Sequence, residues 1–207
     1  MIYAIEEARR VMLAESSAIA RVGQRIDGEL LLLVVKHVER CVAAGGTVHA
    51  AGVGKSGNVA RHLADKLCSI HVPANYLCPL NALHGDLGRI RADDVVFLIS
   101  RSGSCVEIST LAGVLKMHAP AGAPVTIGLT ADPDSDMGRQ CDVVLNCEAG
   151  EEACPHNLVP TVSTAVAYAV ADALVLVLMQ RSGFQPDRFI GTHPGGDLGQ
   201  REATRTN

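Results

Sequence analysis

The chain contains 207 residues and has a net charge of −4 at pH 7; 48% of its residues are hydrophobic, 3% are aromatic, and Trp is absent. A chain of this length can form one α/β domain with a complete core. The lack of a basic run and the scarcity of aromatic rings argue against nucleic acid as a partner. Seven cysteines, an odd number without a C-x-x-C pair, are typical of a reduced cytoplasmic protein.

Neither a secretory signal peptide nor a membrane span is predicted. Arg9 and Arg10 are followed by mixed polar and apolar residues rather than by a continuous apolar segment. The apolar run at 29–35 is far shorter than the roughly 20 residues that cross a bilayer. The run at 165–179 is longer but contains Asp172, so we interpret it as a helix buried in the core or in a subunit interface. The sequence therefore predicts a cytoplasmic protein with no membrane partner.

Apolar periodicity predicts two helices at the start of the chain, 3–22 and 27–44, the second ending at Gly45. Short apolar strands then alternate with helices, a pattern typical of a parallel sheet covered on both faces. Strands are expected near 47–52, 74–77, 94–99, 124–129 and 142–146, and helices at 56–70, 104–118 and 162–182. We therefore predict a single α/β domain over 1–207, a three-layer αβα sandwich with a five-stranded parallel sheet. Its core spans about 40–185, with extra N-terminal helices at 3–44 and a C-terminal segment at 186–207.

The turn "GVGKSG" at 52–57 follows the first strand and raises the question of which phosphate it binds. Gly52, Gly54 and Gly57 match the dinucleotide fingerprint, but that site needs an acid at the end of the second strand, and residues 67–85 contain neither Asp nor Glu. A triphosphate-binding P-loop would need Gly where His49 stands. A small phosphate held at the helix N-terminus, beside Lys55 and Ser56, fits better, and a tight turn without ligand remains the alternative.

The turn at 99–107, "ISRSGSCVE", follows the third strand and concentrates hydroxyl groups. Ser100, Ser102 and Ser104 surround Gly103 just before a predicted helix. Hydroxyls and backbone N–H groups gathered at a helix start form a neutral cradle for phosphate. Simple helix capping is the alternative, but one Ser would be enough for a cap.

The segment 150–164 follows the fifth strand and carries Glu151 and Glu152. A carboxylate at this edge could move protons, whereas a solvated surface pair is the alternative. Cys154 and His156, with His84 or His193, could suggest a metal, but their spacing matches no standard zinc pattern, so we predict no metal. His84 and His193 each lie near a Gly-Asp-Leu-Gly turn, and spacing alone assigns neither a role.

These turns together resemble the sugar isomerase (SIS) domain and, within it, the arabinose 5-phosphate isomerase (KpsF/GutQ-type) family. The matching segments are "GVGKSG" at 52–57, "ALHGDLG" at 82–88, "ISRSGSCVE" at 99–107, "EACPHNLVPTVST" at 152–164, "DALVLVLMQRSGF" at 172–184 and "HPGGDLG" at 193–199. The resemblance extends over nearly the whole chain. In this sequence Cys105 stands where Ser or Thr is common, Ser104 replaces a frequent Glu, and Asp197 stands where Ala is common.

The resemblance implies an isomerase that interconverts ribulose 5-phosphate and arabinose 5-phosphate through an enediol, usually to supply Kdo, and needs no cofactor. It implies a homotetramer, an assembly that would allow His193 to act in a neighbour's site. Many members carry a pair of CBS domains, which we do not expect here. Rival hypotheses are an isomerase of another sugar phosphate and a non-catalytic sugar-phosphate sensor.

The resemblance also assigns roles to residues. The expected catalytic residues are Lys55, Glu107, Glu152, His193 and His84. The expected phosphate- and substrate-binding residues are Gly54, Ser56, Gly57, Ser100, Ser102, Gly103, Ser104, Thr161, Ser163 and Thr164. Our hypothesis makes Glu152 the base for proton transfer between C1 and C2, and Lys55 the oxyanion donor. His193 would open the ring or relay a proton, and Glu107 would position Lys55 or a substrate hydroxyl.

Overall fold

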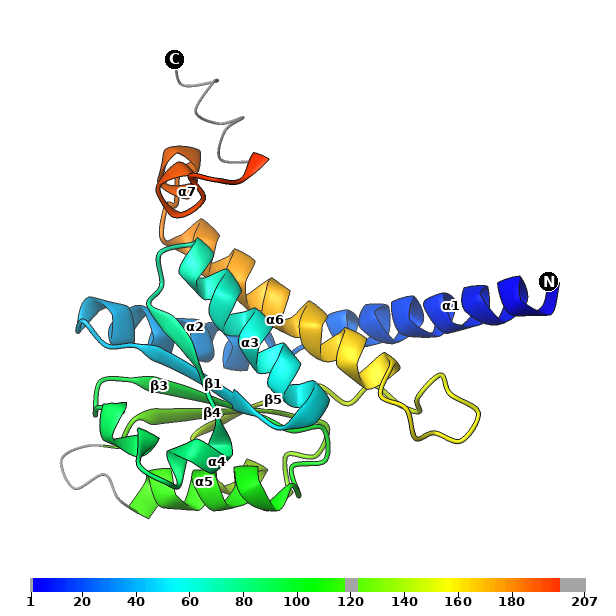
Figure 1. The fold of residues 1–207 in the computed structure, drawn as a ribbon, viewed down its shortest axis with the longest axis horizontal. Coiled ribbons are helices and arrows are strands. Elements are labelled where there is room, and N and C mark those ends of the chain that lie inside the picture. Colours follow the sequence, from blue (N-terminus) through cyan, green and yellow to red (C-terminus); the bar gives the residue numbers. More distant parts are fainter. Residues whose placement is uncertain (1, 118–122, 198–207) are drawn as a thin grey trace.

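The computed structural model describes residues 2–117 and 123–197, in which helices and short strands alternate (Figure 1). The helices are α1 (Ile2–Arg25), α2 (Gly28–Ala43), α3 (Gly54–Ser69), α4 (Pro79–Ala82), α5 (Val106–Met117), α6 (Val162–Arg181) and α7 (Pro186–Thr192). The strands are β1 (Val48–Gly52), β2 (Ala74–Leu77), β3 (Val95–Ile99), β4 (Val125–Thr130) and β5 (Val143–Asn146). Two 3-10 turns, η1 (Asp86–Arg89) and η2 (Gly138–Gln140), complete the pattern.

The five strands form one sheet in the order β2-β1-β3-β4-β5, and every neighbouring pair is parallel. The predicted five-stranded parallel sheet is therefore confirmed. The chain leaves β1 toward one edge to form β2 and then returns to the other side of β1 to form β3. The carboxyl ends of β1 and β3 thus lie at the point where the strand order reverses, which is where ligands bind in open α/β sheets.

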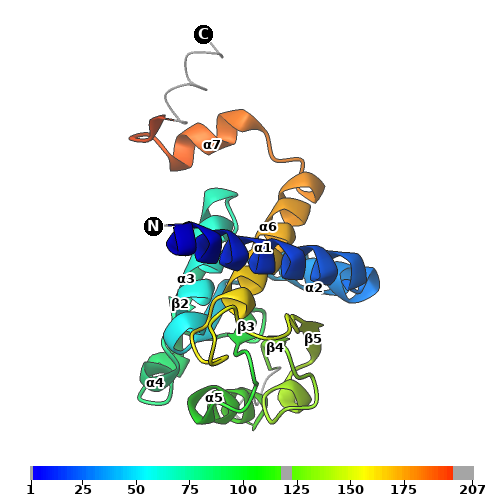
Figure 2. The same cartoon turned by 90° about the vertical axis from the view of Figure 1, so that its right-hand side faces the viewer.

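Both faces of the sheet are buried under helices. Alternate residues of a strand point to opposite faces, so neighbouring residues of one strand belong to different cores. In β3, Phe97 belongs to the core between the sheet and helices α1, α2, α3 and α6. Its neighbours Val96 and Leu98 belong to the second core, which α4 and α5 cover. Figures 1 and 2 show these helices on the two sides of the sheet. The three-layer αβα architecture predicted from the sequence is confirmed.

The N-terminal helices differ in how much of them is covered. Asp27 caps α2 by accepting hydrogen bonds from the backbone N–H groups of Glu29 and Leu30. The second half of α1 packs on α6 through Ala18 and Val22, whereas its first half projects from the body of the protein (Figure 1). Tyr3, Met12 and Leu13 on that part of the helix are exposed.

Several elements differ from the prediction, most of them by one or two residues at an end. Helix α1 continues to Arg25, three residues beyond the predicted end. The short helices α4 and α7 were not predicted, and each begins with a proline at its first position, where a missing backbone N–H costs nothing. Helix α4 ends shortly before His84, and α7 ends directly before His193.

Within the described part of the chain, α6 is the one helix whose length and composition would allow it to cross a membrane. One face of it is buried against α1, α2 and α3, with Val166, Val170 and Leu174 in the core. This face agrees with the prediction of a helix buried in the core, while Leu176 on the same helix is exposed.

Candidate active site

A cavity of about 370 Å³ opens at the carboxyl edge of the sheet, between the starts of α3 and α6 and the loop after β3. This volume suits a small organic ligand. Its polar lining comes from Lys55, Ser56, Ser100, Arg101, Ser102, Cys105, Thr130, Ser163 and Thr164. Its apolar lining includes Val53, Val59, Ile99, Ile108, Leu129, Cys147, Pro160 and Ala167. Two cations, several hydroxyls and nearby helix N-termini make the cavity suitable for an anion.

The glycines of the first turn allow α3 to begin close against the end of β1. A side-chain carbon on Gly52 would lie 2.6 Å from the Ser56 carbonyl oxygen, and one on Gly57 would lie 2.8 Å from the Gly52 carbonyl oxygen. Gly54 has a φ of +58°, which favours glycine. The G-x-G-x-x-G pattern is thus explained by packing and turn geometry. Lys55 and Ser56, in the first turn of α3, line the cavity.

The second turn brings two of its three serines to the cavity. Ser100 is buried and Ser102 is exposed, and both line the cavity. The Ser104 hydroxyl is 2.8 Å from that of Ser102 and does not itself line the cavity. Gly103 has a φ of +63°, and a side-chain carbon there would overlap the Ser135 hydroxyl. Gly103 therefore shapes the turn, and the members of the expected phosphate cradle that line the cavity are Ser100 and Ser102, with Ser56 from the first turn.

Glu107 does not itself line the cavity and lies in the first turn of α5, in contact with a residue that does. It is exposed, and its Oε2 accepts a hydrogen bond of 2.9 Å from the thiol of Cys105, a residue that lines the cavity. The Cys105 thiol and the backbone N–H at the helix start lower the pKa of the Glu107 carboxyl. Burial and the adjacent carboxylate raise the pKa of the Cys105 thiol. Glu107 is therefore an ionised carboxylate whose side chain remains open to solvent and ligand.

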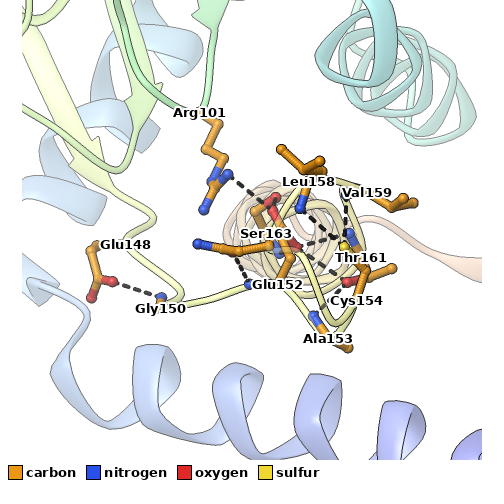
Figure 3. Close-up of polar contacts among 11 residues, drawn as sticks. Arg101, Glu148, Gly150, Glu152, Ala153, Cys154, Leu158, Val159, Thr161 and Ser163 are labelled. Atoms are coloured by element: carbon orange, nitrogen blue, oxygen red, sulfur yellow. Dashed lines mark hydrogen bonds and ion pairs between the residues drawn. The ribbon is translucent and has the colours of Figure 1, made fainter.

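Glu152 lies behind the cavity, with a fully buried side chain at the start of α6 (Figure 3). Its Oε2 accepts hydrogen bonds from the backbone N–H of Thr161 (2.9 Å), the backbone N–H of Ser163 (3.1 Å) and the Thr161 hydroxyl (3.2 Å). Its Oε1 accepts from the Ser163 hydroxyl and lies 3.4 Å from Nη1 of Arg101. Burial alone would raise the pKa of Glu152, but the hydrogen bonds and Arg101 outweigh it and lower the pKa. Glu152 is thus an ionised cap of α6 whose two oxygens are already engaged.

The loop that carries Glu152 is held by its own polar groups. Asn157 accepts a hydrogen bond of 2.7 Å from the Glu152 backbone N–H, and the Cys154 thiol accepts from the backbone N–H groups of Leu158 and Val159 at 3.0 and 3.2 Å. These backbone donors lower the pKa of the Cys154 thiol. Of the substrate residues expected in this segment, Ser163 and Thr164 line the cavity and Thr161 contacts Glu152.

The two expected histidines do not line the cavity. His84 follows α4, in the turn that leads to η1. His193 follows α7, where it stacks on Phe189 and its Nε2 lies 3.5 Å from the Ser69 hydroxyl. Lys55 and Ser69 are at opposite ends of α3, about 21 Å apart at 1.5 Å per residue. His193 is therefore remote from the cavity of its own chain. Among residues 2–117 and 123–197, no group of three His, Cys, Asp or Glu side chains could hold a metal ion.

Arg101 is a cavity residue that sequence reasoning missed. It stands between Ser100 and Ser102, both of which were singled out, and its guanidinium reaches from the loop after β3 toward Glu152 (Figure 3). A cation between two serines of a predicted phosphate turn was the available signal. Its pairing with Glu152 could not be seen, because the two residues lie in different turns, far apart along the chain.

The fold and the cavity together define a three-layer α/β protein with a cavity suited to an anion at the carboxyl edge of its parallel sheet. Residues 45–177 match the family model of the SIS domain, and the chain belongs to the SIS domain family. The SIS family predicted from the sequence is confirmed.

Relatives of the chain include named isomerases. It is 39% identical over 197 residues to "Arabinose 5-phosphate isomerase KdsD" of Pseudomonas aeruginosa, an alignment that covers 95% of this chain and 58% of the relative. It is 34% identical to "Arabinose 5-phosphate isomerase KpsF" of Escherichia coli, with 98% and 60% covered. Thus the chain spans about three fifths of the length of these curated relatives. A solved structure of a protein from Escherichia coli CFT073 in complex with arabinose 5-phosphate aligns with a TM-score of 0.85 at 31% identity, covering 93% of this chain and 98% of that one.

Proposed function

We propose that the protein interconverts D-ribulose 5-phosphate and D-arabinose 5-phosphate. The observation that carries this proposal is the convergence of Lys55 and the serines of two turns on one cavity at the strand-order switch point. The names of the curated relatives and the arabinose 5-phosphate bound to a similar structure support the choice of sugar. The cavity volume of about 370 Å³ is adequate for a pentose phosphate.

The reaction moves one proton between two carbons of the open sugar. A base removes a proton from C1 of the ketose while the C2 oxygen gains one, which gives an enediol. The same proton, or one from solvent, then adds to C2, and the C1 hydroxyl loses its proton to become the aldehyde. Ser56, Ser100 and Ser102 anchor the phosphate, and Ser163 and Thr164 contact the sugar from the start of α6. Lys55 stabilises the negative oxygen that develops on the enediolate.

Glu107 is the better candidate for the base among the two carboxylates implicated by the sequence. It is exposed, and the thiol that donates to it belongs to Cys105, which lines the cavity. Glu152, the base expected from the sequence, has both oxygens engaged by α6 and Arg101, so its carboxylate is not free to reach a substrate. Glu107→Gln should lower kcat by at least about 100-fold. Thr110→Ala, at an exposed position one turn further along α5, is a matched control that should not.

The proposed assembly is a homotetramer in the cytoplasm, with Kdo biosynthesis as the pathway served. Tyr3, Met12 and Leu13 on α1 and Leu176 on α6 are exposed apolar side chains that neighbouring subunits would cover. In such an assembly His193 and His84 reach the cavity of a neighbouring chain, where they open the ring or relay a proton. Light scattering of the purified protein tests the assembly directly.

The deciding experiment follows ribulose 5-phosphate by proton NMR in D₂O with metal-chelated protein. Appearance of arabinose 5-phosphate with deuterium at C2 is expected, because an enediol exchanges its proton with solvent. Conversion without deuterium would keep the isomerase and exclude an exchanging intermediate. If folded protein gives no conversion, a panel of pentose and hexose phosphates distinguishes an isomerase of another sugar phosphate from a sensor that binds without turnover.

A further inference from the structure

We infer that Arg101, held in place by Glu152, is a phosphate-binding residue that sets the affinity of the site. This assignment rests on the proposed function in that the ligand is taken to be a sugar phosphate. Arg101 follows the end of β3 closely and lies between Ser100 and Ser102, the two serines of the phosphate cradle that line the cavity. Its side chain also lines the cavity and remains 45% exposed.

The Arg101 guanidinium is directed toward the side of the cavity where α6 begins. Its Nη1 lies 3.4 Å from Oε1 of Glu152 (Figure 3). Glu152 is itself immobilised, because the backbone N–H groups of Thr161 and Ser163 and the Ser163 hydroxyl all donate to it. A fixed carboxylate therefore holds one edge of the guanidinium against the cavity wall.

The guanidinium keeps donors to offer to a ligand. It carries five N–H donors in a planar fork, and Glu152 lies 3.4 Å from one nitrogen, farther than in a charge-assisted hydrogen bond. The polar side chains on either side of it in the turn, Ser100 and Ser102, are neutral hydroxyls. Paired Arg–phosphate contacts are geometrically specific and stronger than neutral hydrogen bonds. Arg101 thus adds a charged contact to a cradle that would otherwise consist of hydroxyls and helix N-termini.

Glu152 acts on the ligand through other residues. Since both of its oxygens are engaged, it is a positioning residue: it caps α6, which presents Ser163 and Thr164, and it orients Arg101. Loss of a positioning carboxylate weakens ligand binding through Arg101. Loss of a base would instead lower kcat by about 100-fold or more with little change in KM.

The test compares Arg101→Gln, Arg101→Lys and wild type by calorimetric binding of inorganic phosphate and of arabinose 5-phosphate, and by kinetics. Arg101→Gln should weaken both ligands by about 10- to 100-fold, the range for a lost hydrogen bond to a charged group. Arg101→Lys should recover part of the loss. Arg181→Gln is the matched control, since Arg181 pairs with Glu39 at the far end of α6; it should bind like wild type. Phosphate binding reads out Arg101 even if wild type turns over no arabinose 5-phosphate.

Three results would overturn the inference. Affinity for both ligands within twofold of wild type in Arg101→Gln would remove Arg101 from the site. Weaker binding of the sugar phosphate alone would place Arg101 on a sugar hydroxyl instead of the phosphate.

The third result concerns Glu152. Glu152→Gln should raise KM when introduced into wild type and raise it much less when introduced into Arg101→Gln, because the two residues act through one contact. If Glu152→Gln instead leaves KM unchanged, still unfolds cooperatively and loses about 100-fold or more in kcat, Glu152 is the base and not a positioning residue.

Discussion

At the amino edge of the sheet, His49 and Asp94 are buried and find their partners within the protein, whereas at the carboxyl edge Lys55 and Arg101 line a cavity with few internal partners. His49 and Asp94 at the amino edge are each 2% exposed. Asp94 accepts hydrogen bonds from the backbone N–H groups of Thr47 (2.8 Å) and Arg91 (2.7 Å) and lies 3.2 Å from Nε2 of His49. Nδ1 of His49 lies 3.0 Å from the Asn75 side-chain oxygen. This cluster ties the starts of β1, β2 and β3 together.

The carboxyl edge follows a different principle. Lys55, in the described part of the chain, has no ion pair, and Arg101 is tied by one contact to Glu152. Charges with few internal partners contribute little to folding and remain available to a ligand. The two edges of one sheet thus separate stability from binding, and substitutions at each edge should affect different measurements.

Asp94→Ala should give the largest effect on stability, a loss of about 3–5 kcal/mol in the free energy of unfolding. It leaves His49 and two backbone N–H groups buried without their acceptor, the situation in which a broken buried pair is most costly. Urea denaturation at fixed protein concentration measures it. Asp93→Ala, at the exposed neighbouring position, should change stability by less than about 0.5 kcal/mol. Equal losses in the two variants would mean that the amino edge is not a stabilising cluster.

Lys55→Met, at the carboxyl edge, should affect activity and not stability. It should lower turnover by about 100- to 1,000-fold, the range for removal of one oxyanion donor. Its stability should stay close to that of wild type, because Lys55 is exposed. Steady-state kinetics in both directions measure the effect, with Lys36→Met on α2 as the control for loss of an exposed Lys. A variant that keeps more than a tenth of wild-type turnover would refute the role given to Lys55.

Gly103→Ala tests whether the cradle depends on backbone shape, and it should cost about 1–3 kcal/mol of stability. The residue has a φ of +63°, and the new methyl group would overlap the Ser135 hydroxyl, which donates to the Asp132 carbonyl and accepts from the Gly138 N–H. Phosphate affinity should fall as well. Gly23→Ala, in α1 with open space around it, should be neutral or stabilising. If Gly103→Ala unfolds like wild type, the turn adapts and its glycine is not required.

The sheet could be predicted from the sequence because its evidence is local. Five short apolar runs, several of them ended by a Gly- or Ser-rich turn, indicate the strands, and parallel strands bring those turns to one edge. Lys55, Ser56, Ser100 and Ser102 were therefore expected together, and they line one cavity.

Side-chain roles were harder to predict, because they depend on contacts that no local pattern encodes. Glu152 becomes a cap because its loop folds back through Asn157 and Cys154 onto the start of α6. Arg101 is oriented by that carboxylate. His193 lies about the length of α3 from the cavity, so its role depends on packing between chains, which one sequence does not record.

Asp172→Asn should have the smallest effect, a loss of about 0.5–1 kcal/mol in the free energy of unfolding at pH 7. It tests whether burial or the number of partners sets the strength of a polar cluster. Like Asp94, Asp172 has several partners: Nε2 of His62 at 2.6 Å and Nζ of Lys66 at 2.7 Å. Its side chain is 39% exposed, so solvent screens these contacts.

The effect of Asp172→Asn should also depend on pH. Burial raises the pKa of Asp172, but Lys66 and His62 outweigh it, and the net pKa is lowered. A lowered folded pKa stabilises the protein above the unfolded value of about 3.8, and that contribution disappears as the pH falls through the folded value. The difference between wild type and Asp172→Asn should therefore be present from about pH 7 to 5 and shrink below about pH 3.8. Asp65→Asn, at an exposed position of α3, should show little difference at any pH. A loss as large as that of Asp94→Ala would mean that the number of partners, and not burial, sets the strength of such clusters.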